Sequence, residues 1–259
     1  VEEYGVDGFK FDAGDMPFYD SSKIISFVAE TIPNTHTQHF AKLGLKYPLN
    51  EYRASWKMAG LPLAQRLRDQ TPEWGDLRQL IPGIIAQGLM GYAYTCPDMI
   101  GGGEYQSFLA LDSIDQELVV RSAQVHALMP MMQFSVAPWR VLSPENNEIC
   151  KDMANLHAQF GEEILELARQ SATTGEPIVK PMAWFWPAAG YEQIQDQFIL
   201  GDDLLVAPVV EKGARSREVI FPEGNWIGDD GSLVAGPATL EIDVPLERLP
   251  FYRLQPSHD

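Results

Sequence analysis

The sequence contains few cysteines and no long hydrophobic run, and these two absences exclude several classes of protein. Its 259 residues include only two cysteines, too few for a disulfide framework or a cysteine-based metal cluster. No stretch of 18 or more apolar residues occurs, and proline, glycine and glutamine interrupt the richest segment, 80–94. That segment predicts a core helix leading into a strand rather than a membrane segment. No part of the chain has the pattern of a signal peptide or of an N-x-S/T glycosylation site.

Positive charge is also scarce in this chain. Nineteen lysines and arginines against 36 aspartates and glutamates give a formal net charge of −17 at pH 7. A chain with this charge repels nucleic acid and anionic membrane surfaces, so neither is expected as a partner. The hydrophobic content of 45% is ordinary for a globular protein with a real core. Composition assigns neither a cellular compartment nor an oligomeric state.

The first two thirds of the chain have an α/β pattern. The chain begins without methionine and within a strand pattern, so we expect it to be the C-terminal portion of a longer polypeptide. Up to residue 173, short apolar runs alternate with helical ones, and the glycine- and proline-rich loops follow strands, as in a barrel. Strands are expected at 5–12, 65–69, 92–96 and 131–134, and a further short strand is expected to end near Arg53. Helices are expected at 76–89, 115–129 and 147–170.

The last third has a different pattern. From residue 174 to residue 259, short apolar runs are separated by turn residues, which predicts a small all-β sandwich as a second domain. The expected strands are 178–184, 197–200, 204–209, 217–221, 233–234, 239–244 and 251–254. We therefore predict two domains, 1–173 and 174–259.

The segment 5–15, GVDGFKFDAGD, carries the first chemical signal. Side chains alternate along a strand, so Lys10 and Asp12 are expected on one face while Phe9 and Phe11 point to covering helices. A neighbouring ammonium favours the ionised carboxylate. An ionised aspartate at the end of a barrel strand is what a carboxylate nucleophile requires. The alternative is a structural Lys–Asp pair that caps the next turn.

Four motifs in order give this chain a resemblance to a known family. GFKFD is followed by RASW at 53–56, by QRLRDQTPEWG at 65–75, and by CPDMIGG at 96–102. The chain resembles family 31 of the glycoside hydrolases, which are retaining enzymes acting on α-linked sugars. The segments 97–102, 129–140 and 174–181 resemble an α-galactosidase-like branch of that family. The resemblance implies strands four to eight, approximately, of a TIM (β/α)8 barrel, followed by the β-sandwich.

The resemblance implies a pair of catalytic aspartates. It assigns Asp12 as the nucleophile and Asp69, 57 positions later, as the general acid/base. A retaining glycosidase needs one ionised and one protonated carboxyl group, about 5–5.5 Å apart. Arg66 and Arg68 lie near Asp69 in sequence and would lower its pKa, whereas an acid needs the pKa raised. We therefore expect these arginines to point elsewhere, or the glycosyl-enzyme to compensate.

Further residues correspond to the sugar site of the family. The resemblance assigns Arg53 and Lys10 as ligands of sugar hydroxyls, and the fork of Arg53 also suits contact with Asp69 itself. Asp98 corresponds to a carboxylate on the pocket floor, and the alternative is an aspartate that caps a turn before glycines. For Arg53 the alternative is a salt bridge at the surface.

Three tryptophans are candidates for stacking on sugar faces, with core or loop packing as their alternative. These are Trp56, Trp74 and Trp139. Many α-glucosidases of the family have a sugar-binding histidine near the position of Trp139. The stretch 135–139 contains no histidine, which favours the galactosidase-like branch.

The function expected from the sequence is that of a retaining α-glycosidase, α-galactosidase-like, whose partner is an α-linked carbohydrate. The alternatives are an α-glucosidase, α-xylosidase or sulfoquinovosidase of the same family, or a non-catalytic carbohydrate-binding homologue, which the presence of both Asp12 and Asp69 disfavours. No cofactor or metal is expected, because the family uses none and the spacing of Asp12, Asp15 and Asp20 crosses a strand end. Without the first three strands of a barrel, this chain alone is expected to be inactive.

Overall fold

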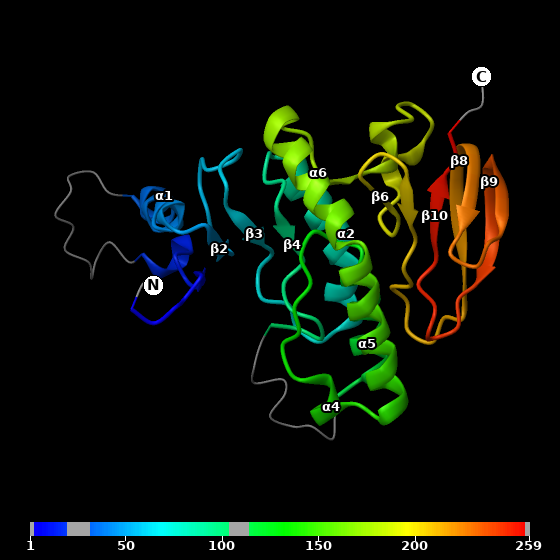
Figure 1. The fold of residues 1–259 in the computed structure, drawn as a ribbon, viewed down its shortest axis with the longest axis horizontal. Coiled ribbons are helices and arrows are strands. Elements are labelled where there is room, and N and C mark those ends of the chain that lie inside the picture. The colour runs from blue at the N-terminus through cyan, green and yellow to red at the C-terminus, as the bar shows by residue number, and fades with distance from the viewer. Residues whose placement is uncertain (1–2, 20–31, 104–113, 257–259) are drawn as a thin grey trace.

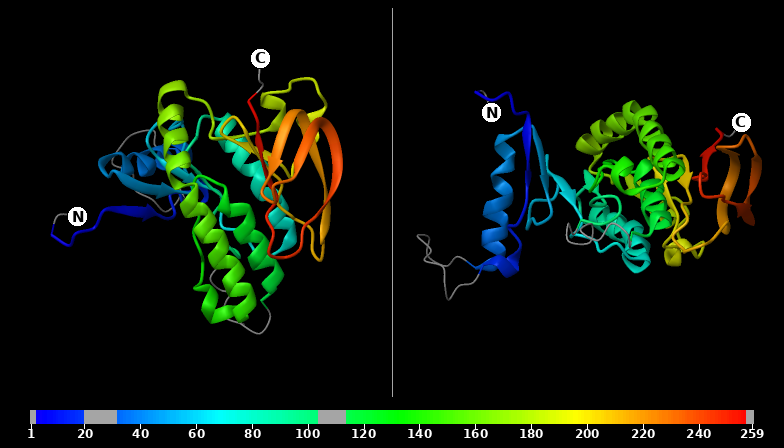
Figure 2. Two further views of the ribbon diagram at one scale, coloured as in Figure 1. Left: turned by 45° about the vertical axis from the view of Figure 1, so that its right-hand side comes forward. Right: turned by 90° about the horizontal axis from the view of Figure 1, so that it is seen from below.

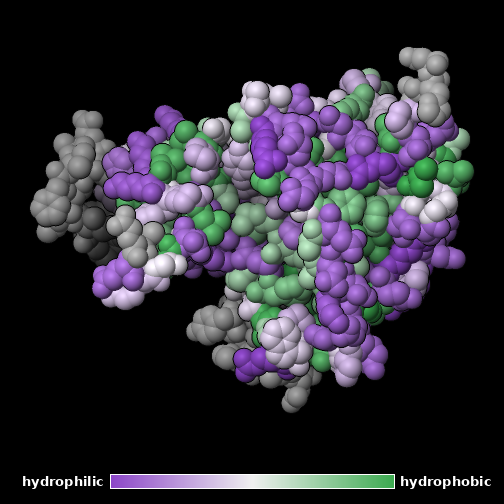
Figure 3. Space-filling view, in the orientation of Figure 1, coloured by the Kyte–Doolittle hydropathy of each residue, from purple (hydrophilic) through white to green (hydrophobic). Residues whose placement is uncertain are grey.

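The computed structural model describes residues 3–19, 32–103 and 114–256. The chain runs from a small sheet and helix α1 (Pro33–Lys42), through a central group of helices, to a second sheet (Figures 1 and 2). In Figure 1 the blue N-terminal part and the orange and red C-terminal part lie at opposite ends of the horizontal axis. The described part of the chain contains no helix that combines the length and the apolar character of a membrane span. On the face shown in Figure 3, hydrophilic side chains predominate, with hydrophobic ones in smaller separate areas.

The first sheet is parallel. Its strands are β1 (Gly8–Phe11), β2 (Leu49–Tyr52), β3 (Ala64–Arg66) and β4 (Thr95–Cys96), paired in chain order. The α/β prediction is thus confirmed, whereas the described residues form an open sheet and not a closed barrel. The strand expected at 131–134 is reduced to one parallel bridge between Ile100 and Phe134.

Helices pack beside this sheet and toward the second one. They are α2 (Trp74–Leu89), α3 (Gln116–Ala127), the short α4 (Pro138–Val141), α5 (Pro144–Gln159) and α6 (Gly161–Thr174). The single helix expected at 147–170 is wrong, because α5 ends at Gln159 and α6 begins at Gly161. Gly161 lowers the helix propensity at this junction. The break was not predicted, because the stripe of apolar residues continues from the first helix into the second. Asp115 and Ser143 cap α3 and α5 by accepting backbone hydrogen bonds.

The second sheet is antiparallel, in the order β5-β6-β7-β10-β8-β9. Its strands are β5 (Val179–Lys180), β6 (Phe198–Leu200), β7 (Leu204–Val206), β8 (Ser216–Gly228), β9 (Leu233–Asp243) and β10 (Phe251–Leu254). The two facing sheets of the predicted sandwich are not seen, because the described strands from β5 onward are joined in one sheet. The turn-forming residues 222–225 do not end a strand: they form a bulge between Phe221 and Gly224, so β8 continues through them and stays paired with β9.

Two hydrophobic clusters cover the two faces of this second sheet. One contains Ile178, Phe198 and Val206 together with side chains of α2, α3 and α5, so it joins the sheet to the helices. The other contains Phe221 and Trp226 and lies within the sheet's own part of the chain. The helices that follow the parallel sheet therefore rest on the antiparallel sheet through a continuous apolar contact.

Candidate active site

Several charged side chains meet where the parallel strands end. Arg66 is the last residue of β3, while Asp12 and Arg53 directly follow β1 and β2. Asp69 and Asp98 lie three and two residues after the ends of β3 and β4. Because the carboxyl ends of parallel strands lie at one edge of a sheet, the topology gathers these residues.

Arg53 connects the two aspartates that were predicted as the catalytic pair. Its Nη1 lies 3.2 Å from Oδ1 of Asp12 and 2.6 Å from Oδ2 of Asp69. Because both oxygens contact the same nitrogen, the distance between them cannot exceed the sum of these two contact distances. The Nε of Arg53 donates to Oδ2 of Asp15 at 2.9 Å, which fixes the guanidinium from the side of the loop after β1.

Arg66 makes a second connection between the same aspartates. Its Nη2 donates to Oδ1 of Asp12 at 2.8 Å, and its Nη1 donates to Oδ1 of Asp69 at 2.7 Å. The Nη1 also contacts Oδ1 of Asp98 at 3.1 Å, and the Nε lies 3.4 Å from Oε1 of Glu51. The Arg66 side chain is 2% exposed, so a buried cation stands at the centre of four carboxylates.

The environment of Asp69 differs from the one expected for a resting acid. Partial burial alone would raise the pKa of Asp69, but hydrogen bonds and charges from Arg66 and Arg53 hold it below its usual range. The expectation that both neighbouring arginines point elsewhere is wrong for Arg66. Arg68 does not contact the Asp69 carboxylate: its exposed side chain donates to Asp76 and to the backbone carbonyl of Asp69, both at 3.0 Å.

Asp98 is the fully buried carboxylate of the group. Its Oδ2 accepts from the backbone N–H of Gln70 at 2.9 Å, while its Oδ1 contacts Arg66. Burial raises the pKa of Asp98 in spite of these partners. A Cβ atom on Gly103 would lie 2.4 Å from Oδ2 of Asp98, which explains why the glycine run continues to this position.

Lys10 does not form the predicted pair with Asp12. Its Nζ lies 3.2 Å from Oε1 of Glu51 and donates to Oε1 of Gln133 at 2.9 Å. The physical reason is that β1 ends at Phe11, so the alternation of side chains does not extend to Asp12. The cations beside Asp12 are therefore Arg53 and Arg66, while Lys10 belongs to a neighbouring polar group.

The tryptophans predicted for sugar stacking lie outside this cluster of contacts. Trp56 is 43% exposed and lines an open pocket together with Arg53 and Asp15. Trp139, on α4, is 74% exposed. The Nε1 of Trp74 donates to Oδ2 of Asp115 at 3.0 Å. Asp20, the third carboxylate considered for a metal, lies outside the described residues.

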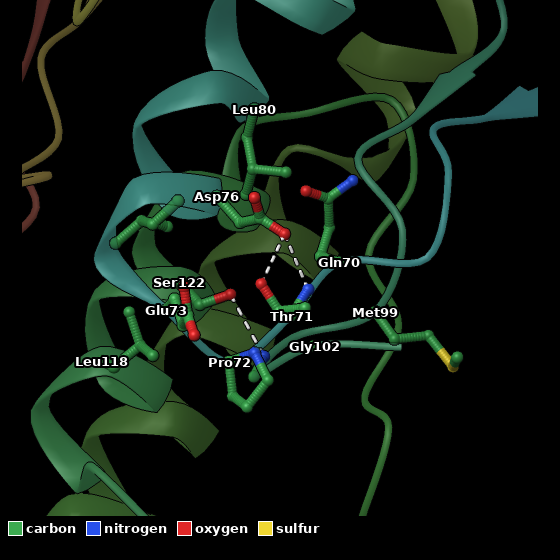
Figure 4. A pocket seen from close by; sticks show the side chains of 12 residues that line it. Gln70, Thr71, Pro72, Glu73, Asp76, Leu80, Met99, Gly102, Leu118 and Ser122 are labelled. Carbon is green, nitrogen blue, oxygen red and sulfur yellow. Dashed lines mark hydrogen bonds between the residues drawn. The ribbon is translucent and has the colours of Figure 1, made fainter. Parts of the chain in front are cut away.

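The loops that carry Asp69 and Asp98 are each held by hydrogen bonds to a helix (Figure 4). The backbone N–H and the hydroxyl of Thr71 donate to Oδ2 of Asp76, on α2, at 2.7 and 2.8 Å. On the other side, Ser122 of α3 accepts from the N–H of Gly101 at 3.2 Å. Asp69 and Asp98 thus stand on loops that the flanking helices fix.

Sequence reasoning missed four residues of this arrangement. Asp15, Glu51, Arg66 and Asp76 were not predicted as site residues. A signal was available for Glu51 and Arg66, because charged residues near the ends of short apolar strands are unusual unless they are paired. The sequence gives no comparable signal for Asp15 or Asp76.

Comparison with known folds supports the architecture. Residues 175–254 match the family model of the glycosyl hydrolase family 31 C-terminal domain. The family 31 dextranase of Flavobacterium johnsoniae in complex with glucose is similar in fold, with a TM-score of 0.81 and 23% identity over 98% of this chain and 34% of that chain. A family 31 α-xylosidase from a soil metagenome has a TM-score of 0.76 and 23% identity over 87% of this chain and 38% of that chain.

Curated proteins extend the similarity to almost the whole chain. The mouse myogenesis-regulating glycosidase is 34% identical over 94% of this chain and 35% of its own length. The SITS-binding protein of Tetronarce californica is 33% identical over 67% of this chain and 25% of its own length. The 1,3-alpha-isomaltosidase of Kribbella flavida is 26% identical over 97% of this chain and 37% of its own length. The chain belongs to glycoside hydrolase family 31 and spans between 25% and 37% of these relatives.

Proposed function

We propose that the whole protein is a retaining α-glycosidase in which Asp12 is the nucleophile and Asp69 the general acid/base. In this proposal the parallel sheet is part of a (β/α)8 barrel, and the site lies at the carboxyl ends of its strands. The observation that carries the proposal is the shared contact of Asp12 and Asp69 with one nitrogen of Arg53, at 3.2 and 2.6 Å.

That shared contact limits the type of mechanism. Retaining glycosidases have carboxyl groups about 5–5.5 Å apart, whereas inverting enzymes place them about 6.5–9.5 Å apart to leave room for a water molecule. Two oxygens in contact with the same nitrogen are too close for the inverting arrangement. The spacing therefore favours double displacement, with a covalent glycosyl ester on Asp12.

The charge state of Asp69 has to change during this reaction. With Arg53 and Arg66 both in contact, the ionised form of Asp69 is favoured, whereas departure of the leaving group requires a proton. We propose that bound sugar displaces part of the Arg53 contact, since Arg53 is the more exposed of the two arginines. Loss of that contact raises the pKa of Asp69 toward the value that an acid needs.

An α-galactoside is the proposed substrate class. Its support is the absence of histidine at 135–139, where many α-glucosidases of the family bind sugar hydroxyls. An α-glucoside is the second candidate, because relatives include the 1,3-alpha-isomaltosidase and the human neutral alpha-glucosidase AB, 29% identical over 71% of this chain. The name of the SITS-binding protein supports a third candidate, a binding protein without turnover.

The test is hydrolysis of 4-nitrophenyl α-galactoside, α-glucoside and α-xyloside by the full-length protein. We expect the galactoside to have the highest kcat/KM and Asp12→Asn to abolish its turnover. Asp152→Asn is the matched control, because Asp152 is an exposed carboxylate on α5. A preference for the glucoside would overturn the galactoside assignment alone, whereas turnover that survives in Asp12→Asn would overturn the nucleophile. Binding without turnover of any glycoside would favour the third candidate.

A further inference from the structure

Asp12 presents its two carboxylate oxygens to different surroundings. Its Oδ1 receives the Nη2 of Arg66 at 2.8 Å and also lies 3.2 Å from Nη1 of Arg53. Within the part of the chain that the structure describes, no hydrogen bond or ion pair reaches Oδ2 of Asp12. The Asp12 side chain is 65% exposed, so Oδ2 is the oxygen accessible to a ligand.

The cation that holds Oδ1 is itself rigidly held. Arg66 is buried. Its Nη1 contacts Asp69 and Asp98, and its Nε lies 3.4 Å from Oε1 of Glu51, an ion-pair distance without a hydrogen bond. Asp98 is fixed from behind by the backbone N–H of Gln70. A planar guanidinium whose two Nη nitrogens donate to three separate carboxylates has a single orientation, so it also fixes the rotation of the Asp12 carboxylate.

We propose that Arg66 is a positioning residue that selects Oδ2 of Asp12 as the attacking oxygen and then stabilises Oδ1 while the glycosyl ester is hydrolysed. The inference rests on the proposed function, because it requires Asp12 to be the nucleophile. Arg66 acts through Asp12 and does not need to contact the sugar.

The two chemical steps place different demands on Arg66. In the first, a bond forms between Oδ2 and the anomeric carbon, the bond to the leaving oxygen breaks, and Asp69 gives that oxygen its proton. Oδ1 then becomes the carbonyl oxygen of an ester. In the second, water attacks the anomeric carbon, Asp69 accepts the proton, and the electron pair of the breaking bond returns to the Asp12 carboxylate. A cation at Oδ1 stabilises the negative charge that returns to Asp12, so it assists the second step.

Loss of this contact therefore has a distinctive kinetic signature. When the leaving group is activated, weakening the contact between Arg66 and Oδ1 of Asp12 slows the second step more than the first. The glycosyl ester on Asp12 therefore accumulates. Accumulation lowers kcat and KM together and leaves kcat/KM less affected. A merely structural role would instead lower the amount of active enzyme without increasing the share of ester.

The experiment compares Arg66→Lys with the wild-type full-length protein on 2,4-dinitrophenyl α-galactoside. Lysine keeps a positive charge among the carboxylates that surround Arg66, but it lacks the planar guanidinium that donates to several carboxylates at once. We expect kcat to fall about 10²-fold, a magnitude typical of losing one preorganised donor, with KM falling and more covalent ester in the intact-mass spectrum of acid-quenched enzyme. Arg169→Lys, at an exposed arginine of α6 that pairs with Glu166, is expected to match the wild type.

The outcomes separate this inference from the proposed function. Equal losses of kcat and kcat/KM without added ester, or unchanged kinetics, would refute the role of Arg66 while the enzyme assignment stands. A wild-type protein without turnover, or an Asp12→Asn variant with normal turnover, would overturn the proposed function and the inference with it. If Arg66→Lys folds poorly, the quenched spectrum of its folded fraction gives the same comparison, because the ester share is a ratio.

Discussion

The junction between α3 and the second sheet depends on one buried arginine. Arg121 is fully buried, and its guanidinium donates to the carbonyl of Val244 at 2.9 Å and of Ala214 at 3.0 Å. It also donates to Oε1 of Gln124 at 2.9 Å, and the Nε2 of Gln124 donates to the carbonyl of Leu246 at 2.7 Å. Burial lowers the pKa of Arg121 to about 10, which leaves it charged at neutral pH.

We predict that Arg121→Met strongly destabilises the protein. Two backbone carbonyls and one amide oxygen lose a buried donor, and each buried group left unsatisfied costs about 1–3 kcal/mol. Allowing for partial relaxation, we expect a loss of about 3–5 kcal/mol. At about 2–4 °C per kcal/mol for a unit of 150–250 residues, the thermal midpoint falls by roughly 6–20 °C.

Thermal unfolding and limited proteolysis together measure this effect. The proteolysis reports specifically on the loops around Ala214 and Val244, which should be cut sooner once Arg121 no longer holds them. Arg215→Met is the matched control, because Arg215 is half exposed and pairs with Glu117 of α3. Pairs of this kind contribute at most about 1 kcal/mol.

An Arg121→Met variant as stable as the wild type would refute the reasoning. It would mean that the cost of burying an arginine charge without a carboxylate partner offsets its hydrogen bonds, as it does in some buried ion pairs. A loss of stability equal to that of Arg215→Met would lead to the same conclusion.

Three further predictions follow from individual contacts. Gly103→Ala displaces Asp98 and should lower stability by about 1–3 kcal/mol as well as activity, whereas Gly161→Ala, with no atom near its added Cβ, should be neutral or stabilising in chemical denaturation. Asp69→Ala should lose more than 10²-fold in kcat on phenyl glycosides but much less on dinitrophenyl glycosides, with rescue by azide; equal losses on both would contradict an acid role. Burial lowers the pKa of His126 from 6.5 to about 3, so the free energy of unfolding should fall by up to about 1.4 kcal/mol per pH unit as the pH drops below 6.5. His126→Leu should remove this slope, and exposed His39→Gln should keep it.

The agreement between sequence and structure is closest where local signals are strong. The strand predicted at 251–254 has the bounds of β10, and the helix predicted from residue 115 begins after Asp115, which caps α3. The break at Phe160 was missed because an apolar stripe continues from α5 into α6. The long strand β8 was missed because Gly224 resembles a turn residue while it forms a bulge.

The same dependence on local sequence signals explains which site residues could be predicted. Asp12, Asp69, Arg53 and Asp98 were identified from motifs, and the structure brings them together. The role given to Lys10 beside Asp12 was wrong, because it depended on strand alternation continuing one residue beyond β1. Arg66 was judged only by its distance from Asp69 along the chain, whereas its partners come from four different strands and the loops that follow them. Contacts of that kind depend on topology and are not encoded in local spacing.

Covalent trapping of the nucleophile is the most direct test of the central claim. The full-length protein, treated with 5-fluoro-α-galactosyl fluoride, should gain the mass of one fluorosugar, and peptide mapping should locate it on Asp12. Asp12→Asn should remain unlabelled, and proton NMR of the wild-type reaction should show the α-anomer of galactose first. A label on another residue, or first release of the β-anomer, would contradict the account.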